Sequence, residues 1–457
     1  MIHGGECLKA KEIDMLHGSL WDKILIFAFP LALTVFFQQL YNTADTAIVG
    51  RFVSSSAMAA VGTNVPIVAI CVNLFFGVSL GANVMIARYI GSGDENKARQ
   101  SVHSAVLLAL MVGCSLLVIG QLASGWIMSV LDVPDEIRIM AETYLRVYLI
   151  GMPMLALYNV ESAIFRSRGD TSTPLMALFV ASALNCVLDF VAAGVMGFGI
   201  AGVAMATVIA QSVSAIILFV ALRRTSGVVR LSMHELHFNV TRVGEILEVG
   251  IPAAIQAVVF SLSNVVIQSA INSLGTDVMA ASSAAFTLEI NIYCIIASFS
   301  QAATTFVSQN YGAGNMSRCR RATVLSFFIG NGIMLMASAF VYIFGESLMS
   351  LFDSDPEVIR LGMIRIFYVV CFESLNGVMD ILSGALRGYG YSLPPALLAL
   401  IGICGVRLAW VWLVFPFRRA FDTLMMCYPI SWAVACVLIA IAYVHYTKKI
   451  KPMRVLN

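Results

Sequence analysis

Six carboxylic acids lie inside long apolar stretches of this sequence, where a charged group is costly. They are Asp45, Glu161, Asp189, Glu289, Glu373 and Asp380. An acidic side chain at the centre of a membrane helix costs about 2.5–3.5 kcal/mol on insertion scales. Residues kept at such a cost are candidates for function, and carboxyl groups in this setting are suited to holding a proton or a cation.

Asp45 belongs to a polar stripe in the segment QQLYNTADTAIVG. Gln38, Asn42 and Asp45 recur at i, i+4 and i+7. This spacing places them on one face of a helix, with Tyr41 beside the stripe. Because a polar stripe on an apolar helix should face a cavity and not lipid, we predict that Gln38, Tyr41 and Asn42 line a substrate cavity.

A second polar pair, Asn185 and Asp189, is spaced i, i+4 on a later apolar stretch, and Thr207 lies in the next one. Asp189 follows Pro174 by 15 residues, about 22 Å of helix rise, so it should reach a depth similar to that of Asp45. Two close carboxylates in a poorly solvated site cannot both ionise cheaply, so one should hold a proton. The same oxygens also suit Na+, and the residue types do not choose between H+ and Na+.

The second half of the chain carries its own acids. Glu373, Asn376 and Asp380 recur at i, i+3 and i+7, again on one helical face. Glu289 lies within another apolar run. These groups could contact a cationic substrate or bind a second ion, or they could form structural pairs with arginines of the same half, and the sequence leaves both possibilities open.

Two further patterns have simpler explanations. Glu161 precedes Arg166 and Arg168, and we expect a salt bridge at the inner end of a helix. The segment from Gly77 to Gly81 matches GxSxG, but a nucleophile elbow needs a strand, a turn and a helix. We predict instead a close helix crossing at these glycines. With no nucleophile or metal constellation, the chain is not expected to be an enzyme or to hold a cofactor or structural metal.

The composition of the chain indicates the class of protein in which these residues lie. The chain of 457 residues is 59% hydrophobic and 12% charged, with a mean hydropathy of +0.87. A soluble domain is about 45–50% apolar and about 25% charged. We therefore predict a polytopic protein in a lipid bilayer. The net charge is +2 and the basic residues are dispersed, which argues against a nucleic-acid partner.

Apolar runs bounded by charges, glycine or proline predict an all-α protein with twelve transmembrane helices. Their approximate limits are 22–48, 57–87, 100–124, 136–164, 174–196, 199–222, 245–272, 279–307, 321–344, 357–384, 394–416 and 422–446. With the N-terminus inside, inner segments carry 20 Lys and Arg and outer segments carry 5. Because inner loops are enriched in these residues, both termini are expected in the cytoplasm.

The chain also contains an internal repeat. Arg88 to Ala98 reads RYIGSGDENKA, and Gln309 to Cys319 reads QNYGAGNMSRC, at an offset of 221. Each half then holds six spans, an even number, so the halves should be parallel repeats related by a pseudo-two-fold axis along the membrane normal. We predict an N-terminal lobe at 1–222, a cytoplasmic linker at 223–243 and a C-terminal lobe at 244–457.

The acids do not follow the repeat. At an offset of 222 Asp45 meets Ile267, and at 221 Asp189 meets Trp410. A purely structural role remains open, since Asp45 could mark a helix end and Asn185 with Asp189 could join neighbouring helices. A shared structural need would have kept the acids in both halves, so we favour an N-terminal lobe specialised for ion coupling.

Several motifs, taken in order, resemble the multidrug and toxic compound extrusion (MATE) transporters along essentially the full length. They are YNTADTAIVG, the GSG and GAG turns, FRSRGDTSTP, LRGYGYSLPP and YPISW. The resemblance implies an antiporter with alternating access between two lobes, which exports organic cations or other amphipathic compounds against an inward flow of H+ or Na+.

Carried over by residue, the resemblance assigns a cation site to four positions of the N-terminal lobe, as in the DinF-like and archaeal branches. They are Asp45, Asn185, Asp189 and Thr207. The NorM-like branch instead has a glutamate and an aspartate in the C-terminal lobe. Here Phe260 and Asn376 lie near those positions, which favours coupling in the N-terminal lobe.

The resemblance further implies a functional monomer in the inner (cytoplasmic) membrane of a bacterium, a role in drug resistance, and at most a transient Na+ at the coupling site. A lipid or lipid-linked glycan flippase of related architecture is the alternative. It should have a strongly cationic cavity and additional spans, and only Arg146, Arg365 and Arg407 lie within the predicted helices as candidates.

Overall fold

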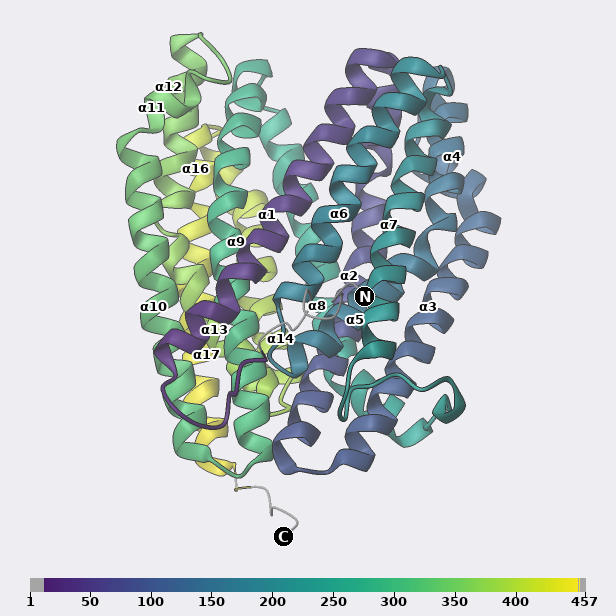
Figure 1. Ribbon diagram of the computed structural model, residues 1–457. Helices are drawn as coiled ribbons and strands as arrows, with labels where there is room; N and C mark the ends of the chain where they lie inside the picture. Colours follow the sequence, from purple (N-terminus) through teal and green to yellow (C-terminus); the bar gives the residue numbers. More distant parts are fainter. Residues whose placement is uncertain (1–11, 451, 453–457) are drawn as a thin grey trace. The chain divides into compact units, whose positions relative to one another are not determined.

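The computed structural model describes residues 12–450 and 452, and these residues form helices, turns and loops with no strand among them (Figure 1). The prediction of an all-α membrane protein is therefore confirmed. In the first half the helices are α1 (Trp21–Phe52), α2 (Ser55–Ser92), α3 (Glu95–Val130), α4 (Asp135–Ile150), α5 (Met152–Ser167), α6 (Ser172–Asp189), the π-helix η1 (Phe190–Val195) and α7 (Gly199–Arg224).

After the short 3-10 helix η2 (Met233–Glu235), the second half begins with the long helix α8 (Val240–Asn272). The helices that follow are α9 (Thr276–Gly312), α10 (Met316–Ile343), α11 (Gly345–Met349), α12 (Pro356–Arg365), η3 (Ile366–Val370), α13 (Glu373–Gly388), α14 (Leu393–Ala399), η4 (Leu400–Gly405), α15 (Val406–Ala409), η5 (Trp410–Val414), η6 (Phe415–Phe417), α16 (Phe421–Met425) and α17 (Cys427–Lys449).

Each predicted span coincides with one helix or one run of helices. In the described chain, ten helical stretches, some of them made of several consecutive helices, are long and apolar enough to cross a membrane. The pair α4 and α5, bent by 48° around Gly151, would make an eleventh span. The predicted span at 357–384 corresponds to α12, η3 and α13, which are interrupted and carry the internal charges Arg365, Glu373 and Asp380.

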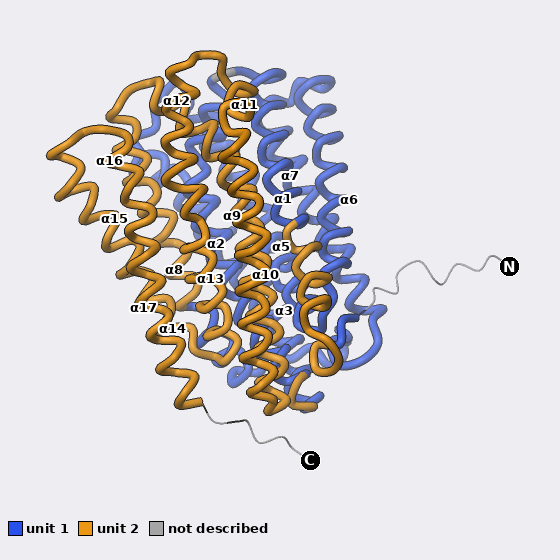
Figure 2. The backbone as a smooth tube through the Cα atoms, turned by 90° about the vertical axis from the view of Figure 1, so that its left-hand side faces the viewer, with its two compact units in different colours: residues 1–14, 33–90, 94–251 blue, residues 15–32, 91–93, 252–457 orange. Residues whose placement is uncertain are grey.

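The chain divides into two compact units, drawn in different colours in Figure 2. The first comprises residues 1–14, 33–90 and 94–251, and the second comprises 15–32, 91–93 and 252–457. In the first unit α3 packs on α5, and α7 packs on α4, α5 and α6. In the second unit α9 packs on α10, α12 and α13, and α13 also packs on α17.

The internal repeat is visible in the backbone. Gly93 and Gly314 both have a positive φ, at +72° and +71°, and each is followed by a residue whose side chain caps a helix. Asp94 accepts from the amide of Lys97, and Asn315 accepts from the amide of Arg318. Only glycine adopts this left-handed conformation without steric cost, so the same turn chemistry has been kept in both halves.

The predicted close crossing at Gly77 and Gly81 is confirmed within the first unit. A Cβ atom on Gly81 would lie 2.1 Å from the carbonyl oxygen of Ile246, and one on Gly250 would lie 2.6 Å from that of Gly77. The missing side chains therefore let the backbones of α2 and α8 touch.

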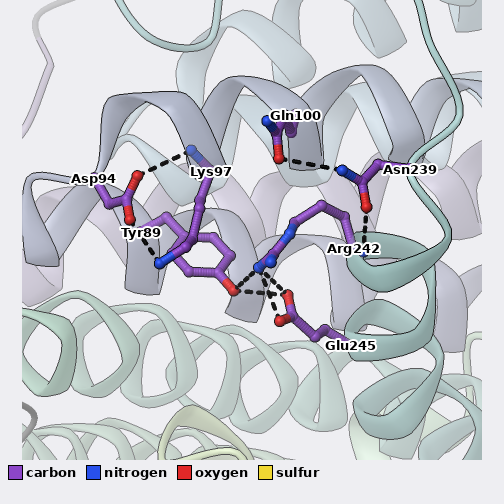
Figure 3. Close-up of polar contacts among 7 residues, drawn as sticks. All are labelled: Tyr89, Asp94, Lys97, Gln100, Asn239, Arg242 and Glu245. Carbon is purple, nitrogen blue, oxygen red and sulfur yellow. Dashed lines mark hydrogen bonds and ion pairs between the residues drawn. The ribbon is translucent and has the colours of Figure 1, made fainter.

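The segment between α7 and α8 is fastened to the first unit by polar contacts at the start of α3. The Nε2 atom of His103 accepts from the amide of Ser232 at 3.1 Å, and Asn239 contacts Gln100 and Ser104. Figure 3 shows the adjoining cluster, in which Arg242 contacts Glu245 and Tyr89.

Within that cluster the Tyr89 hydroxyl donates to Glu245 at 2.6 Å, while Arg242 forms an ion pair with the same carboxylate at 2.6 Å. Asn239 caps α8 by accepting from the amide of Arg242 at 3.2 Å. These contacts hold the first turns of α8 against α2 within the first unit.

Candidate functional site

The first unit brings together the four residues predicted to bind a cation. Asp45 comes from α1, Asn185 and Asp189 from the last turns of α6, and Thr207 from α7. The Thr207 hydroxyl donates to Asp45 at 3.4 Å and to the carbonyl of Val203 at 3.1 Å. Asp189 lies close enough to interact with both Asp45 and Asn185. Side chains from three separate helices therefore lie near one another in this unit.

The polar atoms of this cluster are incompletely satisfied. Asn185 and Asp189 are fully buried at 0% exposure. Neither oxygen of Asp189, neither polar atom of the Asn185 amide, nor Oδ1 of Asp45 makes a hydrogen bond to the described residues. A buried polar group without a partner costs about 1–3 kcal/mol. A proton shared by the two carboxyl groups, or a cation bound by their oxygens, would remove much of this cost.

A local irregularity of the helix adjoins the acids. The regular helix α6 ends at Asp189, and the π-helix η1 begins at Phe190. The second half has a π-helix at the corresponding place, since η5 begins at Trp410. The two repeats are therefore distorted at nearly equivalent positions. π-helical turns change the direction of side chains and are frequent at functional sites.

A cavity of about 240 Å³ lies next to this cluster, within the first unit. The three predicted residues Gln38, Tyr41 and Asn42 all line it. Its other lining residues are Val35, Gln39, Val68, Val72, Tyr148, Leu155, Tyr158, Asn159, Leu178, Ala181, Ser182, Ala210, Gln211 and Ser214. A mainly apolar wall with a few amide and hydroxyl groups is typical of a site for amphipathic small molecules.

The sequence reasoning missed several of these lining residues. Tyr148 and Gln211 meet in the cavity wall, where the Gln211 amide donates to the Tyr148 hydroxyl at 3.3 Å. A signal was present for Gln211, which follows Thr207 by one turn of helix, at i+4, and so shares its helical face. Tyr148 gave no such signal because tyrosine is common in apolar helices without any binding role.

The acids of the second unit take part in separate contacts. Glu289 forms an ion pair with Arg365 at 2.8 Å, and Arg365 also donates to Ser282 at 2.6 Å. Glu373 accepts from the Asn376 amide at 2.8 Å, and both are buried. Asp380 interacts electrostatically with Arg387. The structural alternative thus applies to Glu289, while Glu373 keeps one oxygen without a hydrogen-bond partner in the described chain.

The salt bridge expected at Glu161 is wrong. Both oxygens of Glu161 are buried and make no hydrogen bond or ion pair to the described residues. Because α5 ends at Ser167, Arg168 leaves the helical face of Glu161 and pairs instead with Glu12 at 2.9 Å and Asp170 at 3.4 Å. Arg166 stays within α5, but at i+5 from Glu161 it lies on a different helical face.

Comparison with known proteins relates this geometry to a family. The MatE family model matches twice, over residues 30–191 and 252–413, so the two matches are themselves related by an offset of 222. The chain is 25% identical over 450 residues to "Probable multidrug resistance protein YoeA" of Bacillus subtilis (strain 168), covering 94% of this chain and 95% of the relative. It is 29% identical over 376 residues to "Probable multidrug resistance protein NorM" of Thermotoga maritima, covering 81% and 80%.

A solved structure described as MATE in complex with MaL6 superimposes with a TM-score of 0.90 at 22% identity, covering 96% of this chain and 99% of the other. This likeness supports the predicted architecture of twelve transmembrane helices in two six-helix lobes. The two family matches together span well over half of the sequence. The chain therefore belongs to the MatE family.

Proposed function

We propose that this protein is a secondary active exporter of amphipathic, mainly cationic compounds, driven by H+ or Na+ entering at Asp45 and Asp189. The observation that carries the proposal is the pair formed by the half-buried Asp45 and the buried Asp189, whose unsatisfied oxygens lie beside a mainly apolar cavity in the same unit. Relatives named as multidrug resistance proteins support the export of drugs.

Ion binding and substrate binding are coupled through helix α1. Asp45 and the lining residues Gln38 and Asn42 share one face of this helix, so a change in the charge of Asp45 acts on the wall of the cavity. Binding of H+ or Na+ removes the repulsion between Asp45 and Asp189 and draws α1 toward α6. The cavity then loses its affinity for substrate, which leaves toward the outside.

Pro30 gives α1 a place to bend during this change. Proline lacks an amide hydrogen and interrupts the hydrogen-bond ladder of a helix. It lies inside α1, close to the point at which the chain passes from the second unit to the first after Ala32. Coupling requires only that ion and substrate favour different conformations of the cavity, with alternating access between the two lobes.

The test is substrate efflux from proteoliposomes, driven first by an imposed pH gradient and then by an imposed Na+ gradient. Asp45→Asn and Asp189→Asn keep the size of the side chain but remove its charge, and each should abolish gradient-driven efflux. Asp380→Asn is the matched control, because it removes an acid of the second unit, and it should keep at least half of the parental rate.

Two outcomes would contradict the proposal. Efflux that survives in both Asp45→Asn and Asp189→Asn would exclude coupling at the acid pair. Loss of efflux only in Asp380→Asn would move coupling to the second unit. The response of the parent to the two gradients identifies the driving ion in either case.

A further inference from the structure

The second unit carries a buried arginine close to the position that corresponds in the repeat to the proposed coupling site of the first unit. At an offset of 222 Ile267 corresponds to Asp45, whereas the offset of 221 that relates Gly169 to Gly390 places Arg407 opposite Cys186, the residue after Asn185. At an offset of 221, Tyr428 corresponds to Thr207. The repeat-related position in the second unit has therefore lost both acids and gained a guanidinium group.

Arg407 is held by neutral groups. It is 6% exposed, and its guanidinium carbon lies 4.2 Å from the centre of the Tyr428 ring. Its Nε donates to the Ser431 hydroxyl at 3.1 Å, and its Nη1 donates to the Asn264 side-chain oxygen at 3.2 Å. Contact with an aromatic face contributes about 0.5–2 kcal/mol toward stabilising a cation.

No carboxylate of the described chain forms an ion pair with Arg407. Arg365, a buried arginine that also lies over the Tyr428 ring, does have such a partner in Glu289 at 2.8 Å. Glu373 interacts with Arg407 only at longer range, and one of its oxygens accepts from Asn376. A buried charge without a direct counter-ion is expensive, which suggests that part of its compensation comes from a ligand.

One nitrogen of the guanidinium group is left over. Nε and Nη1 donate to Ser431 and Asn264, whereas Nη2 makes no hydrogen bond to the described residues. Asn264 beside it is exposed on α8. At an offset of 222, Asn264 corresponds to Asn42, which lines the cavity of the first unit. Arg407 and Asn264 therefore carry hydrogen-bond donors on the face of α8 that corresponds, in the repeat, to the cavity-lining face of α1.

We propose that Arg407 and Asn264 form a binding site for the acidic group, a carboxylate, phosphate or sulfonate, of an amphipathic substrate. Guanidinium donors suit such groups because they can make two parallel hydrogen bonds. The inference rests on the proposed export function and widens its substrate class from cations to zwitterions and anions. Aromatic rings at Tyr428 and Trp432 hold the guanidinium in place.

Rhodamine 110 and rhodamine 123 test this site, because the second dye is the methyl ester of the first and differs only in lacking the acid. Binding is measured by fluorescence anisotropy with the full chain in nanodiscs of phosphatidylcholine, without any ion gradient. Arg407→Gln should weaken binding of rhodamine 110 by about tenfold or more, as expected for loss of a hydrogen-bonded charge. Binding of rhodamine 123 should change less than twofold.

A second variant leaves Arg407 in place. Asn264→Asp puts a carboxylate beside the guanidinium group. This carboxylate should occupy the guanidinium donors, so binding of rhodamine 110 should weaken while binding of rhodamine 123 changes little. Because Asn264 is exposed, this variant should fold normally, which thermal unfolding checks. Equal losses of affinity for both dyes, or unchanged affinity for rhodamine 110 in both variants, would overturn the proposed binding site.

A lipid headgroup is the other source of such an acidic group. If phosphatidylglycerol added to the nanodiscs displaces rhodamine 110 from the parent but not rhodamine 123, the site belongs to lipid and the substrate assignment is overturned. Since binding is measured without a gradient, failure of this proposal is separate from failure of coupling at Asp45 and Asp189.

Discussion

At the scale of single residues, the charges of this protein differ greatly in what surrounds them. The ion pair of Glu289 with Arg365 is almost fully enclosed, with side-chain exposures of 14% and 5%. The pair of Glu357 with Arg360 is open, at 50% and 62%. Water already solvates the open pair, whereas the enclosed charges depend on each other.

We therefore expect Glu289→Gln to destabilise the protein strongly. Removing one partner of a buried pair leaves the other charge uncompensated, at a cost of about 3–5 kcal/mol. Glu357→Gln, the matched control in the same unit, should leave stability nearly unchanged. Thermal unfolding in detergent measures both variants, and equal behaviour would show that Arg365 finds other compensation.

Asp94 provides a pH-dependent contribution outside the membrane-spanning segments. Its hydrogen bond and ion pair with Lys97, at 2.8 Å, hold the pKa of its carboxyl group below the usual range. The stability that this pair contributes is present above the unfolded pKa, near 4, and is lost as the pH falls through the lower folded pKa. The unfolding temperature of the unsubstituted protein should therefore be lower at about pH 3 than at about pH 7.

The second repeat suggests the control, because Asn315 caps its helix at the position equivalent to Asp94. Asp94→Asn should keep the cap but remove this part of the pH dependence. Asp94→Ala should lose both, with a penalty of about 0.5–2 kcal/mol for the cap at neutral pH. A parental pH profile identical to that of Asp94→Asn would show that the ion pair contributes nothing.

At the scale of elements, helix contacts depend on where glycine removes the side chain. Gly81 on α2 meets the backbone of α8, and a Cβ atom there would lie 2.1 Å from the Ile246 oxygen. A Cβ atom on Gly62, in the same helix, would meet no atom of another described element within 4 Å. Gly81→Ala should cost about 1–3 kcal/mol through overpacking.

Gly62→Ala should instead leave stability unchanged or raise it slightly, since alanine is the better helix former by about 0.5–1 kcal/mol. The difference between the two variants in thermal unfolding isolates the crossing from any general effect of alanine. A Gly81→Ala variant as stable as the parent would mean that α2 and α8 separate without cost.

The elements also show what sequence could predict. Each span predicted from an apolar run coincides with one helix or one run of helices. Gln38, Tyr41 and Asn42 line the cavity, and they could be singled out because their pattern lies within one helix. The bend at Gly151 and the π-helix after Asp189 were not predicted, since an apolar run looks the same whether it is straight or distorted. Contacts between helices, such as Gln211 with Tyr148, depend on packing that spacing does not encode.

At the scale of the whole molecule, two copies of one pattern have diverged in charge while keeping their turns. Gly169 and Gly390 both have φ of +95°, and the residues that cap helices recur at Asp94 and Asn315. The buried polar groups differ, since Asp189 of the first unit corresponds to Trp410 at an offset of 221 and Arg407 is buried nearby in the second unit. Turns are constrained by backbone geometry in each repeat, whereas the ligand-facing groups are free to specialise.

Orientation is the property of the whole molecule that can be tested most directly. Inner loops carry 20 of the Lys and Arg and outer loops carry 5 when the N-terminus is placed in the cytoplasm. Such a bias opposes translocation of the basic loops. Green fluorescent protein inserted after Ser226 should fluoresce and alkaline phosphatase there should be inactive, while insertions after Ser354 should give the reverse. With the N-terminus inside, Asp45 lies near the outer end of α1. The opposite pattern at both sites would invert the topology and place this end of α1 near the cytoplasm, where an inward ion gradient could not load Asp45 first.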